Sequence, residues 1–483
     1  MKLQKTLLSG IFWIMLLNLM IKPLWLLGIE VGVQNTVGAE VYGFYFAIFN
    51  LSFIFNILLD LGITNFNTRN IAQSPILVKK HISGILGIKI ALLGLYVLVT
   101  FSVGMLLGYD TRQFNLLALL CVNQFLNSSI LYLRSNFEAL MLFKWDSVLS
   151  VLDRVMMVVI CGFLIWGPFK SEFKIEWFVL SQTSAYLITM LLALGILIKK
   201  TGFHKLTWNR AFSWMILKQS FPYALLVLLM ASYNRIDPVL LEWILPNGSY
   251  AAGIYASAFR LLDALIMVGY LVSVPLLPIF SKLIKEQQID EISFTCKMIS
   301  KLMMAVAIGS TVTLAWISQS FMEVLYWEHT QASAKVFSVV IFCFIPIALS
   351  YIYGTLLTAN GSLKQLNIMA SCALTLNIVI NMLLIPRLGA VGSAWASLST
   401  QTLMAIMQWI LATKTFNIKF KISEAIQLII YIIVIIGCNV MCSHWKMNWW
   451  MHLLSMAMIA LIVAIMLRMI DLRQIIKTIK NKD

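Results

Sequence analysis

The chain has 483 residues, of which 60% are hydrophobic and only 12% are charged, and its mean hydropathy is +0.88. Soluble globular proteins carry about 25% charged residues, so this composition excludes a soluble protein and predicts an integral membrane protein. The net charge of +16 does not indicate nucleic acid as a partner, because the basic residues lie in the connections between apolar segments and not in one domain.

Apolar segments of about 20 residues, the length that a membrane-spanning helix needs, recur along the whole chain. The first, Leu7–Ile29, contains Lys22 and Pro23 and has no small-residue cleavage site, so we interpret it as a span and not as a removed signal peptide. The sequence thus predicts an all-α polytopic membrane protein with about fourteen spans. We place them at residues 8–29, 41–63, 83–108, 114–140, 148–168, 177–198, 221–243, 251–280, 299–319, 335–358, 366–385, 393–413, 427–442 and 451–470.

Lysine and arginine are concentrated in every second connection between these spans. Because basic residues accumulate in cytoplasmic loops, the asymmetry predicts that both termini face the cytoplasm. The longest connection on that side is a basic linker, 199–220, which we expect to lie along the anionic inner leaflet. It separates a first lobe of six spans (1–198) from a second lobe of six (221–413), and two C-terminal spans and a cytoplasmic tail follow (414–483).

A weak internal repeat relates the two predicted lobes. Gly43-Phe44-Tyr45 in the second span corresponds to Gly253-Ile254-Tyr255 in the eighth, and the span before each carries a basic residue near a proline. Transporters are often built from such repeats, with the substrate held between them near the middle of the membrane. The repeat therefore favours a transporter.

The seventh and eighth spans form a hairpin that carries charge within the predicted membrane: Arg235 and Asp237 in one, Arg260 and Asp263 in the other. A charge at the centre of a spanning helix costs about 2.5–3.5 kcal/mol, so such residues usually face a protein interior or a watery cavity. Lys22 is similarly placed in the first span. We predict that Arg235, Arg260 and Lys22 line a cavity for an anionic ligand, since a guanidinium group binds phosphate through two parallel hydrogen bonds. The two aspartates are assigned as gate or pairing residues, and a neutralised Arg260–Asp263 pair is a structural alternative.

Arg134, on the fourth span, is a further candidate for the cationic cavity. Glu138 lies one helical turn away, and a salt bridge near the cytoplasmic end of the helix would explain both charges equally well. The same alternative applies to the adjacent Asp153 and Arg154. Lys89, about one turn inside the third span, is expected to snorkel inward.

The sequence lacks the motifs that several classes of function require. No Gly-x-x-x-x-Gly-Lys-Ser/Thr segment occurs, which excludes a P-loop nucleotide hydrolase. The five histidines are scattered without ligand spacing, so we expect neither a metal site nor a cofactor. The outward loops are too short to build the active site of a membrane glycosyltransferase. We therefore expect no catalytic residues and no enzyme activity, and we interpret the seven cysteines as small core residues.

Three groups of residues carry a resemblance to a known family. They are Leu59-Asp60-Leu61-Gly62-Ile63 with Arg69-Asn70-Ile71-Ala72, Gly253-Ile254-Tyr255 with Ala258-Phe259-Arg260, and Ile385–Ala394 at the start of the twelfth span. In their order and spacing, the chain resembles the oligosaccharide flippases of the multidrug/oligosaccharidyl-lipid/polysaccharide (MOP) exporter superfamily, the Wzx-like transporters of O-antigen and capsule units. The resemblance implies two six-helix lobes that open alternately to either side of the membrane, with two extra C-terminal helices.

The resemblance also implies a substrate and a site. Arg235 and Arg260 match the cavity arginines of the family, and Lys22 is a looser match; they would hold the diphosphate of an undecaprenyl-diphosphate-linked repeat unit while its lipid tail stays in the bilayer. Asp60 and Arg69 would form a cytoplasmic gate or a fold element.

We therefore expect a flippase of lipid-linked oligosaccharide units in the bacterial inner membrane, acting in the synthesis of O-antigen, capsule or exopolysaccharide. Its expected partners are this substrate, membrane lipids, a coupling ion (Na⁺ or H⁺), a polysaccharide polymerase and glycosyltransferases. The alternative is an ion-coupled exporter of small molecules from the same superfamily, whose cavity should be acidic.

Overall fold

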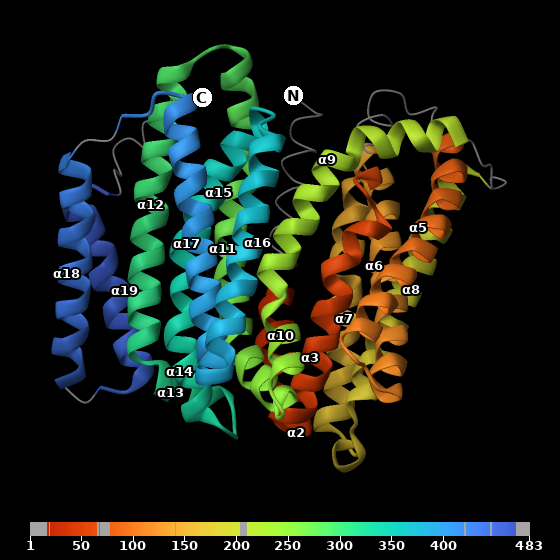
Figure 1. Ribbon diagram of the computed structural model, residues 1–483, viewed down its shortest axis with the longest axis horizontal. Coiled ribbons are helices and arrows are strands. Elements are labelled where there is room, and N and C mark those ends of the chain that lie inside the picture. The colour runs from red at the N-terminus through yellow and green to blue at the C-terminus, as the bar shows by residue number, and fades with distance from the viewer. Residues whose placement is uncertain are drawn as a thin grey trace. The chain divides into compact units, whose positions relative to one another are not determined.

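The computed structural model describes residues 17–18, 20–64, 67, 78–140, 142–202, 210–419, 422–444 and 447–469. Every regular element within these ranges is a helix, so the all-α prediction is confirmed (Figure 1). Contacts between residues group the chain into two compact units, Met1–Gly253 and Ile254–Asp483.

The first unit joins its α helices through one π-helical segment (η1) and two short 3-10 segments (η2 and η4). Its elements are η1 (Leu24–Glu30), α2 (Val31–Val37), α3 (Ala39–Ile54), η2 (Phe55–Leu59), α5 (Val78–Leu106), α6 (Thr111–Ala139), α7 (Phe143–Trp166), η4 (Lys170–Glu172), α8 (Ile175–Thr201), α9 (Arg210–Arg235) and α10 (Asp237–Ile244). Helix α11 (Gly248–Lys285) begins in this unit and continues into the second. The second unit then contains α12 (Ile289–Trp316), α13 (Ser318–Leu325), α14 (Thr330–Val340), η5 (Ile341–Cys343), α15 (Phe344–Ala359), α16 (Leu363–Leu388), α17 (Ala390–Thr415), α18 (Ile422–His444) and α19 (Trp449–Met466).

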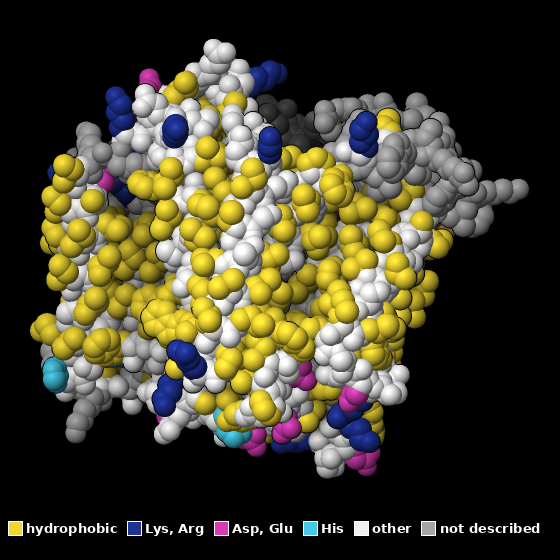
Figure 2. All heavy atoms as spheres, in the orientation of Figure 1, with side chains coloured by type: hydrophobic (Ala, Val, Ile, Leu, Met, Phe, Trp, Pro, Cys, Tyr) yellow, Lys and Arg dark blue, Asp and Glu magenta, His cyan; other side chains and the backbone are white. Residues whose placement is uncertain are grey.

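Eleven helices in the described ranges are long and apolar enough to cross a membrane, or twelve when one bent pair counts as a single span. The chain is therefore a multi-pass membrane protein. Figure 2 agrees: hydrophobic side chains cover the middle of the helices, and charged side chains lie toward their ends. The predicted first span lies partly outside the described residues, and the predicted span 393–413 is α17, which is not among the candidates. The total of fourteen spans stays a prediction.

Helix α17 is polar where it packs against other helices. One face of it packs against α14, α15 and α16, and its exposed face carries the large apolar side chains of Trp395, Ile406 and Ile410. Ser393 Oγ donates a hydrogen bond to Asn381 Oδ1 of α16 at 2.8 Å, and both residues are fully buried. Polar side chains are tolerated on the packed face because hydrogen bonds of this kind satisfy them inside the unit, and they lower the mean hydropathy of the helix. The buried polar side chains of α17 are Ser393, Ser397, Thr400, Gln401 and Gln408.

Three helices of the first unit are interrupted beside a charged residue. The π-helical segment η1 follows directly after Lys22 and Pro23, and proline cannot donate the backbone hydrogen bond of a regular helix. Helix α9 ends at Arg235, and α10 continues at an angle of 51° with Pro238 in its first turn. Helix α3 passes into the 3-10 segment η2 and ends at Asp60. Irregular backbone at membrane depth is tolerated only where protein or a polar cavity surrounds it, so these breaks mark the polar interior of the unit.

The start of α3 and the start of α11 cross with their backbones in contact. A Cβ atom added to Gly43 would lie 1.8 Å from the carbonyl oxygen of Ser249, and one added to Gly253 would lie 1.8 Å from that of Ala39. Gln34 Nε2 also donates to the carbonyl oxygen of Gly253 at 3.1 Å. The contact is reciprocal, as expected of two equivalent segments in a repeat, and only glycine permits it at either position.

The contacts group α9 and α10 with the first unit, whereas the predicted lobes assign everything from residue 221 to 413 to the second. The two divisions answer different questions. The units consist of helices that contact one another, whereas the predicted lobes consist of spans that correspond in the repeat. The predicted lobe boundaries and the linker at 199–220 therefore stay predictions.

Candidate functional site

Three basic residues of the first unit come together from separate helices. Lys22 is half-buried just before Pro23, and the positive charges of Arg134 on α6 and Arg154 on α7 both act on it. Among the described residues, Lys22 forms no ion pair within 4.0 Å, although Asp153 is close enough to attract it. Lys22 is therefore the least neutralised cation of this group, which we call the basic cluster (Lys22, Arg134 and Arg154).

Arg134 is neutralised by a residue that the sequence analysis did not consider. Its Nε donates to Oδ1 of Asp146 at 2.7 Å, and Asp146 is completely buried near the start of α7. The predicted partner Glu138, one turn along α6, does not form this bridge within the described part of the chain. The pairing prediction was thus wrong in its partner, because the α6–α7 turn folds Asp146 back against α6.

Arg154 lies between two aromatic rings. Its guanidinium carbon is 5.5 Å from the ring centroid of Trp25 and 5.9 Å from that of Tyr186, and Nη1 donates to the Tyr186 hydroxyl at 3.3 Å. Oδ2 of Asp153 lies 3.7 Å from Nε of Arg154. Cation–π contacts of this kind hold a guanidinium group in place and leave its edge for hydrogen bonds. The sequence explains Arg154 as a helix-end charge beside Asp153. Its contacts with Trp25 of η1 and Tyr186 of α8 join separate helices, so spacing along α7 gives no signal for them.

Aromatic and amide side chains continue this polar interior. Trp25 stacks on Phe178 at a centroid distance of 5.8 Å, and its indole nitrogen donates to Glu30 at 3.0 Å. Gln182 Nε2 donates to the Tyr45 hydroxyl at 3.2 Å. Buried aromatic side chains with a polar atom need such hydrogen-bond partners, and these rings have them.

Arg235 occupies the break between α9 and α10. Its guanidinium carbon lies 5.4 Å from the ring centroid of Phe53 on α3, and its side chain is half-buried. Asp237, in the first turn of α10, is completely buried, as favoured by the positive end of a helix dipole.

Asp60 is paired with a lysine from α5. Lys89 Nζ is 3.5 Å from Asp60 Oδ1, and the lysine side chain is only 3% exposed. The expectation that Lys89 snorkels inward toward the cytoplasmic end of its helix is therefore wrong, because its ammonium group stays inside the protein and binds at the end of η2. Arg69, the predicted partner of Asp60, lies outside the described residues.

In the second unit, Arg260 is 2% exposed and its Nη1 donates to the Tyr326 hydroxyl at 2.8 Å. Ser257, one turn before it on α11, donates to Ser333 Oγ at 2.9 Å. These bonds connect α11 to Tyr326, which follows α13, and to Ser333 of α14. Asp263 is partly buried one turn after Arg260. Since Arg260 and Arg235 belong to different units, their common cavity stays a prediction.

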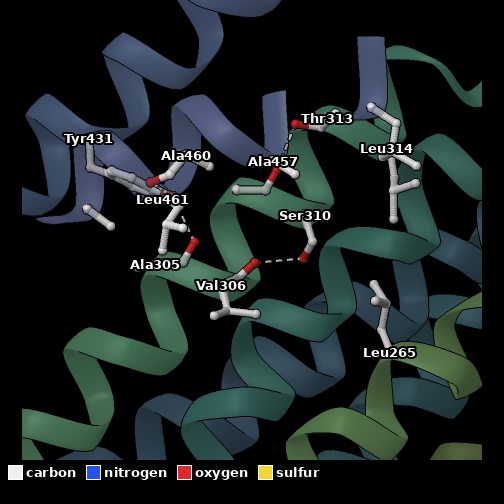
Figure 3. Close-up of a pocket in the computed structure, with 13 residues that line it drawn as sticks. Leu265, Ala305, Val306, Ser310, Thr313, Leu314, Tyr431, Ala457, Ala460 and Leu461 are labelled. Atoms are coloured by element: carbon white, nitrogen blue, oxygen red, sulfur yellow. Dashed lines mark hydrogen bonds between the residues drawn. The ribbon is translucent and has the colours of Figure 1, made fainter. Parts of the chain in front are cut away.

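An apolar pocket of about 530 Å³ lies in the second unit, where the C-terminal helices α18 and α19 pack against α12 (Figure 3). Small residues of α12 and α19, among them Gly309 and Ala460, keep it open, and the Tyr431 hydroxyl beside it donates to the Ala305 carbonyl oxygen at 2.9 Å. A pocket with so few polar atoms suits a hydrocarbon chain. Its lining residues are Leu265, Ala305, Val306, Gly309, Ser310, Thr313, Leu314, Tyr431, Leu453, Ala457, Ala460, Leu461 and Ala464.

Comparison with known proteins gives one family match and several similar folds. The profile of a family described as "Polysaccharide biosynthesis protein" matches residues 7–284, more than half of the chain. No curated protein matches the chain.

Three solved structures illustrate the similarity of fold. A lipid II flippase, MurJ, in an inward closed conformation has a TM-score of 0.73 at 13% identity, over 97% of this chain and 99% of that one. An inward-facing multidrug resistance MATE family transporter of the MOP superfamily has a TM-score of 0.66 at 13% identity, over 81% and 94%. A MOP superfamily transporter from Pyrococcus furiosus, described by the reverse polarity of its binding pocket, has a TM-score of 0.59 at 13% identity, over 86% and 96%. At this identity, the similarity concerns the fold.

Proposed function

Since this chain belongs to the polysaccharide biosynthesis protein family, we propose that it flips undecaprenyl-diphosphate-linked oligosaccharide units from the cytoplasmic to the outer leaflet of the bacterial inner membrane. The product would serve the synthesis of O-antigen, capsule or exopolysaccharide. That a protein of the same fold is a lipid II flippase supports this proposal.

The observation that carries the proposal is the state of Lys22. It is a half-buried cation beside a helix break, without an ion pair among the described residues, and within the field of Arg134 and Arg154. A cation in this setting binds an anion strongly, because water does not screen the charges fully. We assign the diphosphate to the basic cluster in the first unit. Its oxygen atoms would bind Lys22 and would replace Asp146 and Asp153 as partners of Arg134 and Arg154.

Arg235 and Arg260 would bind the same diphosphate or the acidic groups of the sugars during transport. Asp237 and Asp263 would pair with them when the substrate has left, and Asp60 would hold the cytoplasmic end of α3. The apolar pocket beside α12 would receive part of the lipid tail.

The two lobes would open alternately, driven by a coupling ion (Na⁺ or H⁺) or by the membrane potential, which is worth about 2.3 kcal/mol per charge per 100 mV. Both termini would face the cytoplasm, where glycosyltransferases supply the substrate, and a polymerase would use it on the other side.

The first prediction concerns Lys22→Met, which keeps the side-chain length and removes the charge. A hydrogen bond to a charged group contributes about 1.5–3 kcal/mol, so we expect transport to slow about 10–100-fold. The measurement is surface glycan in a deletion strain carrying the variant, together with lipid-linked units retained on the cytoplasmic leaflet.

The matched control is Lys282→Met, which removes a lysine with a 74% exposed side chain at the end of α11. It should leave glycan display unchanged. Normal glycan with Lys22→Met at normal protein level would contradict the assignment of the diphosphate. Normal glycan in the deletion strain itself, with increased sensitivity to small toxic compounds, would instead indicate a small-molecule exporter.

A further inference from the structure

An ammonium group is buried where α3 unwinds. Lys89 lies inside a membrane-spanning helix and is 3% exposed. Its Nζ donates to the carbonyl oxygen of Leu59 at 3.2 Å, and to both the carbonyl oxygen and Oγ of Ser128 at 3.3 and 2.9 Å. The same Nζ atom lies 3.5 Å from Asp60 Oδ1 and 5.6 Å from the ring centroid of Tyr132. The ammonium group is thus surrounded by oxygen atoms from two helical segments, the end of η2 and α6, and by one aromatic face.

The break in α3 creates this arrangement of oxygens. Leu61 and Gly62 both have positive φ, 44° and 84°, which stops the helix after Asp60. The amide of Ile63 donates to the carbonyl oxygen of Asp60, whereas in a continuing helix it would bind that of Leu59. The Leu59 carbonyl is therefore released to accept from Lys89. The Asp60 carboxylate also accepts from the backbone amide of Thr64 at 3.3 Å, which fixes its position.

A carboxylate and carbonyl oxygens that converge inside a membrane protein need a cation, because an unpaired charge there is very costly. Carbonyl, hydroxyl and carboxylate oxygens are also the ligands that alkali-metal and alkaline-earth ions prefer. We propose that the oxygens of Leu59, Ser128 and Asp60 form a binding site for a monovalent cation, and that the ammonium group of Lys89 occupies this site as a tethered cation. The α3 cation site, as we call it, takes an ammonium-sized ion and needs no free metal while Lys89 is in place.

The site has a consequence for ion coupling. With the cation supplied by the chain itself, the break in α3 keeps its structure at any Na⁺ or K⁺ concentration. A coupling ion, if the transporter uses one, binds elsewhere. The inference does not depend on the proposed substrate, because it is tested on the stability of the purified protein and not on transport.

The test uses Lys89→Ala in the full chain, purified in detergent. Removing the side chain leaves the oxygens and a space that a small ammonium ion can enter. We expect ammonium, methylammonium and butylammonium chloride at about 100 mM to raise the Tm of this variant by about 2–4 °C, with potassium chloride acting in the same direction. Choline chloride, which is too large, should have no such effect, and the wild type should respond to none of these salts.

Adding Asp60→Asn to the variant should abolish the effect of ammonium, because the carboxylate provides the charge of the site. A Tm that rises equally with choline, or that rises as much in the wild type, would overturn the proposal. Should Lys89→Ala fail to fold, Lys89→Met is compared with the double variant Lys89→Met, Asp60→Asn. The double variant should have the higher Tm, since it removes an uncompensated carboxylate, and an equal or lower Tm would overturn the proposal.

Discussion

At the scale of the residue, burial decides what a charge does in this protein. Arg134 and Asp146 form a 2.7 Å bridge in which the aspartate is completely buried, while Arg112 and Glu176 form a 3.2 Å bridge with side chains 60% and 40% exposed. The two bridges look alike by distance. In the first bridge the aspartate has lost its water and the arginine side chain is only 17% exposed, so removing one partner leaves the other poorly compensated. In the exposed bridge water replaces the lost partner.

The second prediction compares these bridges. Asp146→Asn keeps the shape of the side chain and removes its charge, and we expect it to destabilise the protein by about 3–5 kcal/mol. Glu176→Gln, the matched change at the surface, should cost about 0–1 kcal/mol. Both are measured as unfolding free energies of the purified variants in detergent. A similar small loss for both would mean that water reaches Asp146.

At the scale of the element, the first unit depends on helix breaks and on one close crossing. Prolines or positive φ angles interrupt the helices beside Lys22, Asp60 and Arg235, so charged groups meet freed backbone atoms inside the unit. The crossing of α3 with α11 brings two backbones together at Gly43 and Gly253. Small residues allow such close packing in membranes, where no hydrophobic effect drives helices together.

The third prediction tests this crossing. Gly43→Val would place side-chain atoms on the backbone of Ser249, so we expect α3 and α11 to separate and folded protein to fall below one tenth of the wild-type amount. Gly94→Ala on α5, where no atom lies within 4 Å of the new Cβ, should be neutral or stabilising by up to about 1 kcal/mol. The measurement is monodisperse protein by size-exclusion chromatography. Equal yields of the two variants would show that the helices do not pack at this distance.

At the scale of the whole molecule, the distribution of apolar and basic residues governs insertion. Hydrophobic side chains cover the middle of the helices on the face shown in Figure 2, and the sequence concentrates lysine and arginine in alternate connections. Such an asymmetry orients a polytopic protein during insertion, because basic loops are retained in the cytoplasm. An even number of spans returns the chain to the side from which it began.

The fourth prediction follows from this orientation. A fluorescent protein that folds only in the cytoplasm should be bright when fused after residue 483, and alkaline phosphatase, active only outside, should be inactive there. After residue 446, in the predicted outward connection between the last two spans, the activities should be reversed. Phosphatase activity at residue 483 would contradict the predicted cytoplasmic C-terminus.

The candidate residues can be selected from the sequence one by one, but their pairing cannot. Lys22, Arg134, Arg235 and Arg260 stand out because a charge in an apolar segment is rare for an energetic reason that acts on each residue separately. The same reasoning also selects Arg154, but a salt bridge with the preceding Asp153 explains its charge as well. Asp146 and Lys89 form ion pairs with residues of other helices. Spacing along one helix cannot predict such pairs, because a large bundle allows very many pairings between charged residues of different helices.

The sequence alone determined that this protein lies in the membrane, that it is helical, and which residues carry charge into the bilayer, because hydropathy and insertion cost are sums over local segments. The tertiary structure decided which charges are neutralised, where α17 hides its polar side chains, and which oxygens surround Lys89. Those outcomes depend on contacts between helices far apart in the chain, and their energies come from desolvation and distance, which exist only once the helices have packed.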